Sequence, residues 1–138
     1  MLSLLAAAVL HIAISSAVLQ GLPRQTISAT DEHGNTAQYS GVALRDVLTQ
    51  QGVPTGEGLR GPVMTRIVVV DAADGYRIVF SLSELDPGMT DRVVLIADQR
   101  DGTPLSAHEG PFRLIVPGEK RGARWIRQVT SIDVEDAP

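Results

Sequence analysis

Short runs of branched apolar residues, separated by turn signals, recur along most of this 138-residue chain and limit the folds open to it. RIVVVD (66–71) and YRIVFS (76–81) flank the turn 72–75, where Gly75 tolerates the positive φ of a hairpin. The segment 24–39, RQTISATDEHGNTAQY, alternates on both sides of an Asp-Glu-His-Gly turn and predicts a second hairpin. These patterns predict sheets with short connections rather than a helical bundle.

Three more strands are expected in the second half. RVVLIAD (92–98) is a continuous branched run, which is typical of a strand buried on both faces. After a turn at 100–104, FRLIV (112–116) predicts another strand, and IRQVTSIDV (126–134) alternates as the last one. The chain has no internal repeat and no linker-like composition, so its length indicates one domain.

Two helical segments interrupt the strands. Ser40 is positioned as an N-cap for VALRDVLTQQ (42–51), and Gly52 as its C-terminal cap. Ser81 and Glu84 have capping-box spacing, which predicts one helical turn over SLSEL. The expected fold class is therefore α+β, a mixed and β-rich single domain. The principal helix carries an apolar stripe formed by Val42, Leu44, Val47 and Leu48.

The first 22 residues form an apolar segment with two interpretations. Residues 2–19 carry no charge other than that of His11, as in the apolar region of a secretory signal. Ser15 and Ala17 have the small side chains that a cleavage site needs. However, no Lys or Arg precedes Arg24, so the basic start of a signal is missing.

The second interpretation is a folded edge. It has a short strand at 11–14 and a helical turn at 15–22 that ends at Pro23. Residues 1–22 are thus treated as an N-terminal apolar segment and residues 23–138 as the main domain. A membrane span is not expected, because the apolar run is barely long enough and contains polar side chains.

Composition excludes several classes of site. The chain has no cysteine, which removes disulfides, thiolate zinc sites and thiol nucleophiles. A formal net charge of -4 argues against general nucleic-acid binding, which needs a basic face. His11, His33 and His108 lack the close spacing of a zinc site, and there is no nucleophile elbow or phosphate loop. No catalytic and no metal-binding residue is therefore predicted.

One region is rich in cations. PGEKRGARW (117–125), here called the basic loop, has glycines whose backbone amides we expect to be exposed. Arginine binds phosphate with two parallel hydrogen bonds, so the segment predicts a site for a small anion. The alternative is that these are solvated charges paired with Asp133, Glu135 and Asp136. Five of the twelve basic residues lie in or beside the loop: Arg113, Lys120, Arg121, Arg124 and Arg127.

Three segments resemble, in order, the molybdopterin-binding domain of the sulfite oxidase family. They are YSGVALRDVLTQQGV, DGYRIVFSLSEL and VVLIADQRDGTPLSAHEGPFRLIVPGEKRGARWIRQVTSIDV, and the resemblance covers residues 25–134. It implies the mixed, β-rich fold of that domain and a pterin-type cofactor. His108 matches the family's turn histidine, and the basic residues lie in or near its phosphate-binding loop. The cofactor-binding candidates are His108, Arg113, Lys120, Arg121 and Arg124.

The chain departs from the family at the metal. Family enzymes hold molybdenum through a cysteine thiolate, which this chain lacks, and the family's Arg-Asn-His cofactor motif is also missing. Serine or aspartate cannot replace a soft thiolate without changing the electronics of the metal, so molybdenum is not expected. A non-catalytic role is therefore favoured over an enzymatic one.

Three functional hypotheses follow. The favoured one is a non-catalytic module that binds a pterin or another small anionic ligand. The second is a degenerate scaffold that acts by protein contact, beside a redox or signalling partner. The third is a molybdenum-cofactor-dependent oxidoreductase with an unusual ligand. Short relatives often look exported, so a periplasmic or otherwise exported protein is expected, with the cytoplasm as the alternative.

Overall fold

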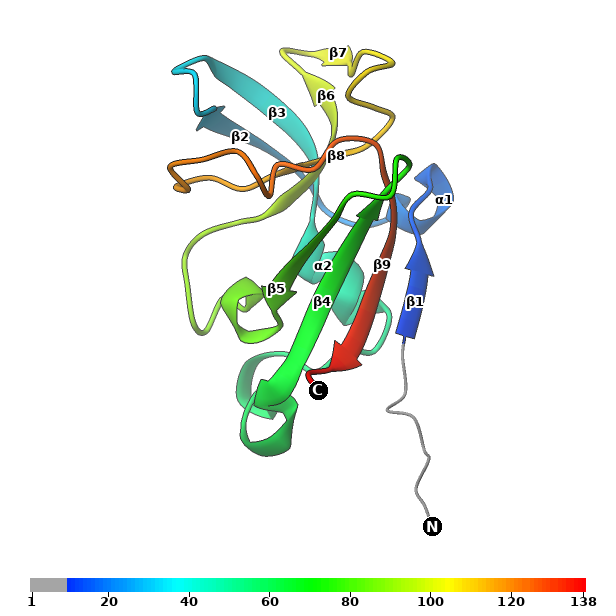
Figure 1. Ribbon diagram of the computed structural model, residues 1–138, viewed down its shortest axis with the longest axis vertical. Coiled ribbons are helices and arrows are strands. Elements are labelled where there is room, and N and C mark those ends of the chain that lie inside the picture. The colour runs from blue at the N-terminus through cyan, green and yellow to red at the C-terminus, as the bar shows by residue number, and fades with distance from the viewer. Residues whose placement is uncertain (1–9) are drawn as a thin grey trace.

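Two antiparallel sheets form the framework of the chain in a computed structural model that describes residues 10–138. The first sheet has four strands in the order β1-β9-β4-β5, so the first and last strands of the chain pair with each other (Figure 1). β4 and β5 form the hairpin expected around Gly75, whose φ is +90°. The bounds are β1 Leu10–Ala13, β9 Val129–Asp136, β4 Arg66–Ala72 and β5 Arg77–Ser81.

The second sheet has the order β2-β3-β6-β7, with the short β8 paired to β6. β2 and β3 form the other expected hairpin, whose register runs from Arg24 opposite Val42 to Thr30 opposite Thr36. The β-rich α+β class is therefore confirmed. The bounds are β2 Arg24–Thr30, β3 Thr36–Ala43, β6 Leu95–Arg100, β7 Thr103–Pro104 and β8 Arg113–Ile115.

The principal helix, α2 (Leu44–Gln50), begins later than the sequence indicated. Ser40 is not its N-cap, because β3 continues to Ala43 and Ser40 instead lies beside Thr26, with 2.8 Å between the hydroxyl oxygens. Pairing with Ile96 and Leu95 of β6 holds this part of β3 extended. Gly52, with a φ of +88°, closes the helix as expected.

The remaining helical segments are short. The capping box is confirmed, since the Ser81 amide donates to Glu84 Oε2 (2.8 Å) and the Glu84 amide to Ser81 Oγ (3.3 Å). Two expected strands start later than predicted, β6 at Leu95 and β9 at Val129, because the residues before them belong to loops. The helical elements are α1 Ser16–Leu19, η1 Gly56–Gly58, η2 Gly61–Thr65 and η3 Ser83–Leu85.

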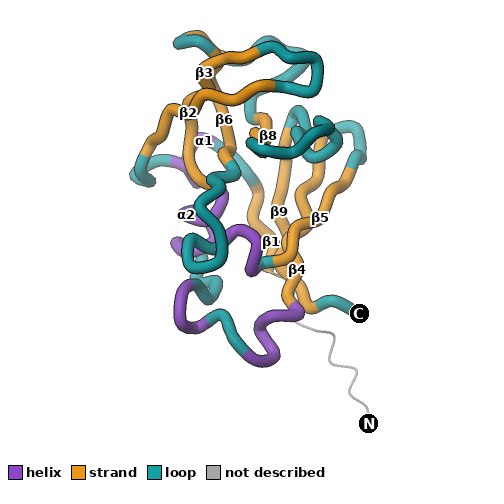
Figure 2. Tube along the Cα trace, turned by 90° about the vertical axis from the view of Figure 1, so that its left-hand side faces the viewer, coloured by secondary structure: helices purple, strands orange, loops and turns teal. Residues whose placement is uncertain are grey.

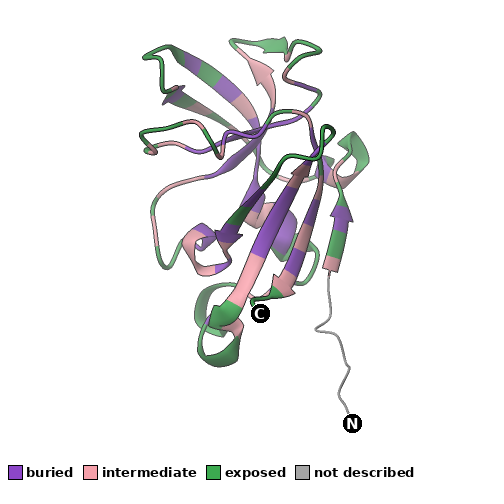
Figure 3. Cartoon of the chain, viewed as in Figure 1, coloured by how far each residue is buried: buried purple, intermediate pink, exposed green. Residues whose placement is uncertain are grey.

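The core lies between the two sheets, which Figure 2 shows on opposite sides of the molecule. Val68 and Val70 of β4 and Ile96 of β6 are fully buried, as is Leu114 of β8. The buried positions alternate with exposed ones along β5, whereas β8 is buried throughout (Figure 3). The β2–β3 turn, the β4–β5 turn and the basic loop lie close to one another at the edge of this core.

The chain from residue 10 onwards packs on the same core. β1 pairs with β9, and Ile12 and Leu19 are only 3% and 6% exposed. Ser15 caps α1 by accepting a hydrogen bond from the Val18 amide. The first nine residues of the apolar segment lie outside the described residues. Within the described part, no helix has the length and apolar character to cross a membrane.

Candidate functional site

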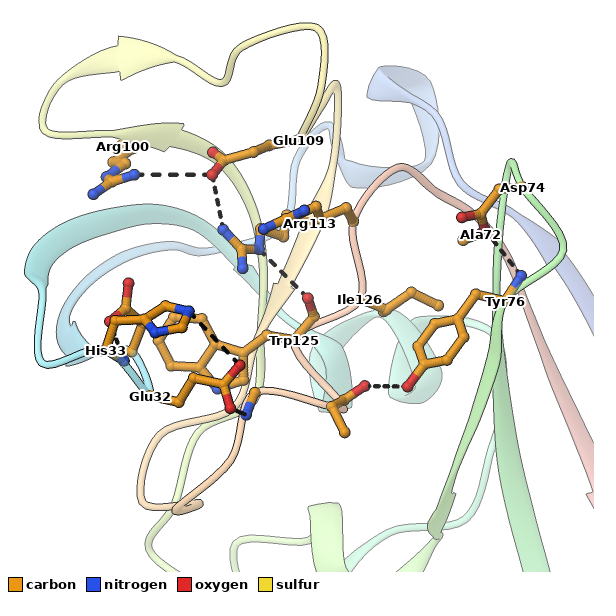
Figure 4. Close-up of a pocket in the computed structure, with 14 residues that line it drawn as sticks. Glu32, His33, Ala72, Asp74, Tyr76, Arg100, Glu109, Arg113, Trp125 and Ile126 are labelled. Carbon is orange, nitrogen blue, oxygen red and sulfur yellow. Dashed lines mark hydrogen bonds and ion pairs between the residues drawn. The ribbon is translucent and has the colours of Figure 1, made fainter.

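A cavity of about 350 Å³ lies where turns from both sheets meet the basic loop (Figure 4). The β2–β3 turn contributes one wall, the β4–β5 turn another, and the chain from β6 to β8 and the β8–β9 connection the rest. The lining combines cationic, acidic and aromatic side chains, which suits a ligand that carries both a charge and a polar ring. Its principal charged side chains are Asp31, Glu32, Asp74, Arg100, Glu109, Arg113 and Arg127.

Arg113 is the most deeply buried cation of the cavity. It is 9% exposed, and its guanidinium lies 5.5 Å from the centre of the Trp125 ring. Nη1 donates to Glu109 Oε1 (2.9 Å) and Nε to the Trp125 carbonyl (3.5 Å), while Nη2 donates to no other residue of the described chain. Burial lowers the pKa of Arg113, with Glu109 acting in the opposite direction, and the group stays cationic. Arg113 therefore keeps donors for a ligand.

Glu109 is shared by two cations. Its Oε1 lies 2.9 Å from Arg113 Nη1 and 3.8 Å from Arg100 Nη1. Arg100 also lies 5.9 Å from the ring centre of Tyr39, which packs edge-on against Trp125. One carboxylate thus only partly neutralises two guanidinium groups, and Figure 4 shows both directed at it.

The opposite walls are held by hydrogen bonds to the basic loop. Tyr76 donates its hydroxyl proton to the Ala123 carbonyl (2.7 Å). Glu32 Oε2 accepts from the Gly122 amide (3.1 Å). Asp31 accepts from the amides of Asn35 and His33, and the Asn35 bond chiefly lowers the pKa of that carboxyl group. The basic loop is therefore tied to the turns of both sheets.

Arg124 does not line the cavity but stands in a separate ionic cluster. Its guanidinium pairs with Glu119 and Glu84, and Nη1 donates to the Val79 carbonyl (2.9 Å). It lies 4.2 Å from the ring centre of Phe80. These contacts with β5, with η3 and with Glu119 of the same loop occupy all three donor nitrogens of Arg124, which is not among the cavity-lining residues.

The acidic tail does not neutralise the basic loop. Asp133 is 2.6 Å from His11, and Asp136 is 3.6 Å from Arg66, on the first sheet. The alternative that paired the loop with Asp133, Glu135 and Asp136 is therefore wrong for Arg124, whose partners are Glu84 and Glu119.

The other candidate residues lie near the cavity rim or outside it. His108 is exposed, with Nε2 2.8 Å from Arg127 Nη1, and Arg127 lines the cavity. Lys120 and Arg121 are exposed and have no ion pair with any residue from 10 to 138. The structure thus brings Arg113 into the cavity and links His108 to it, while the other three candidates are more peripheral.

Sequence reasoning missed several lining residues. Arg100 and Glu109 lie near strand ends, where isolated charges are usually solvated. Glu32 and His33 were interpreted only as turn residues. Glu109 does carry a usable signal, because it follows His108 within the family-like segment and stands four residues before Arg113.

The donor set does not suit molybdenum. The sequence offers no thiolate, and within residues 10–138 no three His, Asp or Glu side chains converge. The cavity does suit an organic anion with a polar ring, since Arg113 and Arg100 face it beside carboxylates that accept hydrogen bonds. The residues therefore fit the organic part of the family's cofactor and not its metal.

Comparison with known proteins identifies a family. The family model described as the oxidoreductase molybdopterin binding domain matches residues 14–138. A search of curated proteins finds no match. Because the match spans nearly all of the chain and follows the resemblance seen in its motifs, the protein belongs to the oxidoreductase molybdopterin-binding domain family.

Proposed function

We propose that this protein is a non-catalytic member of its family that binds a pterin or a similar anionic ring compound in the cavity beside Arg113. The observation that carries the proposal is the guanidinium of Arg113. It is 9% exposed, lies 5.5 Å from the centre of the Trp125 ring, and is only partly satisfied by Glu109 and a carbonyl. A buried cation with unused donors at a cavity wall is a strong anion partner.

The carboxylates of the cavity support a pterin rather than a simple anion. A pterin ring carries amino and ring N–H donors on one edge, and carboxylate oxygens accept from such donors. Asp31 and Glu109 supply these acceptors on the same cavity that holds Arg100 and Arg113. A ring with donors and an attached anionic group matches both kinds of side chain.

The chemistry of the side chains supports binding without redox catalysis. A thiolate would be needed to hold molybdenum as the family enzymes do, and the chain has no cysteine. A pterin would supply redox or metal-binding chemistry when bound, while the residues named above would orient it and neutralise its charge.

Replacing Arg113 by lysine tests the proposal. Lysine keeps the charge but loses the planar pair of donors, so pterin-6-carboxylate should bind about tenfold more weakly or worse. Titration calorimetry with the full chain measures this affinity. The matched control is Arg60→Lys, which alters an exposed arginine at the start of η2 and should leave affinity unchanged.

Folding must be checked alongside affinity, because Arg113 also pairs with Glu109. Thermal melting of both variants provides this check. If a folded Arg113→Lys protein binds as tightly as the parent, the Arg113 site is wrong. If the parent itself binds neither pterin-6-carboxylate nor inorganic pyrophosphate, the scaffold hypothesis replaces the binding hypothesis.

A further inference from the structure

Glu32 already occupies a backbone amide of the basic loop. It sits at the tip of the β2–β3 hairpin, and its Oε2 lies 3.1 Å from the Gly122 nitrogen. A Cβ built on Gly122 would lie 3.3 Å from Glu32 Oε1 and 3.5 Å from its Cδ, so the carboxyl group packs directly over this glycine. An amide that could bind a free anion is thus bound to a carboxylate of the protein itself.

The surroundings of this contact favour an anion over a neutral group. Lys120 and Arg121 directly precede Gly122 and are exposed, with no ion pair to any residue that the structure describes. His33 Nε2 lies 4.0 Å from Glu32 Oε1 on the other side. Glu32 is therefore the one acidic side chain of the described residues that contacts this part of the basic loop by a hydrogen bond.

The contact is also easy to break. The side chain of Glu32 is 42% exposed, so water can replace the loop amide as its partner at small cost. The hairpin tip that carries Glu32 is held by the turn bonds of Asp31, which do not depend on Gly122. Glu32 can leave the amide without unfolding the hairpin.

We propose that Glu32 is an internal competitor that occupies the Gly122 amide until a phosphate-type anionic group displaces it. This inference rests on the proposed function and adds a regulatory residue to the same site. A doubly charged phosphate gains more than a carboxylate from the amide and from Lys120 and Arg121 together. Singly charged anions then compete less well for the Gly122 amide, and Glu32 sets the selectivity at this end of the site.

Removing the competitor should tighten binding. A ligand that competes with Glu32 binds only to the fraction of molecules in which the Gly122 amide is free, and its apparent affinity is lowered in that proportion. Removing the competition from Glu32 should therefore strengthen binding about threefold or more. Glu32→Gln removes the charge. Glu32→Asp keeps the charge but shortens the side chain by one methylene, which moves the carboxylate away from the Gly122 amide when the backbone stays in place. The two variants separate direct competition from a general change in net charge.

The experiment is a titration of the full chain with inorganic pyrophosphate, followed by calorimetry and by the amide signal of Gly122 in ¹⁵N-resolved NMR spectra. The control is Glu57→Gln, which removes an exposed carboxylate on η1 outside the cavity. Both Glu32 variants should bind more tightly than the parent, whereas Glu57→Gln should match it. The Gly122 signal should shift on substitution and again on adding pyrophosphate.

Two results would overturn the inference. Unchanged or weaker pyrophosphate binding by both Glu32 variants, with the parent still binding, would show that Glu32 does not compete and would leave the proposed function intact. If neither the parent nor any variant binds pyrophosphate or pterin-6-carboxylate, the competitor role fails together with the binding function.

Discussion

Gly41 has no Cβ, and this allows β3 and β6 of the second sheet to approach each other closely. A Cβ at this position would lie 1.9 Å from the Ile96 carbonyl oxygen and 2.8 Å from the Ala97 Cα. The register between β3 and β6 shifts between Ser40 and Gly41, which brings the two backbones close together. Both groups are backbone atoms of a buried strand, so they cannot move aside as a flexible side chain would.

Gly41→Ala should therefore destabilise the protein by roughly 2–4 kcal/mol, through overpacking between two central strands. Urea unfolding of the variant and the parent measures the difference. Gly58→Ala is the matched control, because its nearest neighbour would be Pro54 Cβ at 3.7 Å, and it should change stability by less than about 0.5 kcal/mol. A Gly41→Ala protein as stable as the control would show that β3 and β6 lie further apart than described.

At the scale of elements, the ionic cluster around Arg124 attaches the basic loop to the first sheet. Arg124 pairs with Glu119 in its own loop and with Glu84 of η3, and Arg92 contacts the same two carboxylates at 3.4 Å and 3.2 Å. Two cations thus alternate with two anions between β5, η3 and the loop. The cluster positions the loop that forms one wall of the cavity.

The cluster makes stability depend on pH in the acid range. The hydrogen bond from Arg124 chiefly lowers the pKa of Glu119. For Glu84, burial raises the pKa, but the hydrogen bonds from Arg124 and Ser81 outweigh it, and the net pKa is also lowered. A lowered carboxyl pKa stabilises the fold above the unfolded value of 4.5, and this stabilisation is lost as the pH falls through the folded pKa.

Glu119→Gln should remove part of this dependence. At neutral pH the variant should be less stable by about 0.5–2 kcal/mol, since Arg124 and Arg92 each lose a charged partner on a partly exposed surface. As the pH falls below 4.5 and through the lower folded pKa of Glu119, the difference from the parent should shrink, because Glu119 becomes neutral first in the unfolded and then in the folded protein. Urea unfolding from pH 7 to pH 3 measures it, with Glu57→Gln as control. A constant difference at every pH would contradict the role given to Glu119.

Most elements could be predicted from the sequence, and the errors have a common cause. The hairpins and the capping box depend on neighbouring residues, so local patterns reveal them. The start of α2 does not depend on neighbouring residues alone. β3 continues to Ala43 because it pairs with β6, which is more than fifty residues away in the chain. Long-range pairing overrode the local N-cap signal of Ser40.

The candidate site was less predictable, for the same reason. Arg113 was found through a motif, and the structure places it in the cavity. Arg124 belongs to the same motif region, yet Glu84, forty residues earlier, draws it to the other side of the loop. Glu32 reaches the basic loop across ninety residues of sequence. Contacts of this kind follow from the packing of two sheets and leave no local pattern.

At the scale of the whole molecule, the cavity depends on how the two sheets are joined. β8 belongs to the second sheet and β9 to the first, and the chain from one to the other carries the basic loop. Tyr76 from the first sheet and Glu32 from the second both bind that loop. The fold thus provides a ligand-sized cavity of about 350 Å³ in a chain that has no cysteine.

We propose that the chain binds the organic part of such a cofactor without its metal. Protein purified in its native state from a molybdenum-replete host tests this directly, by pterin fluorescence of the denatured extract and by metal analysis of the same sample. We expect a pterin or related anionic ring compound in the extract and molybdenum well below the protein concentration. Stoichiometric molybdenum would contradict it and would restore the oxidoreductase hypothesis.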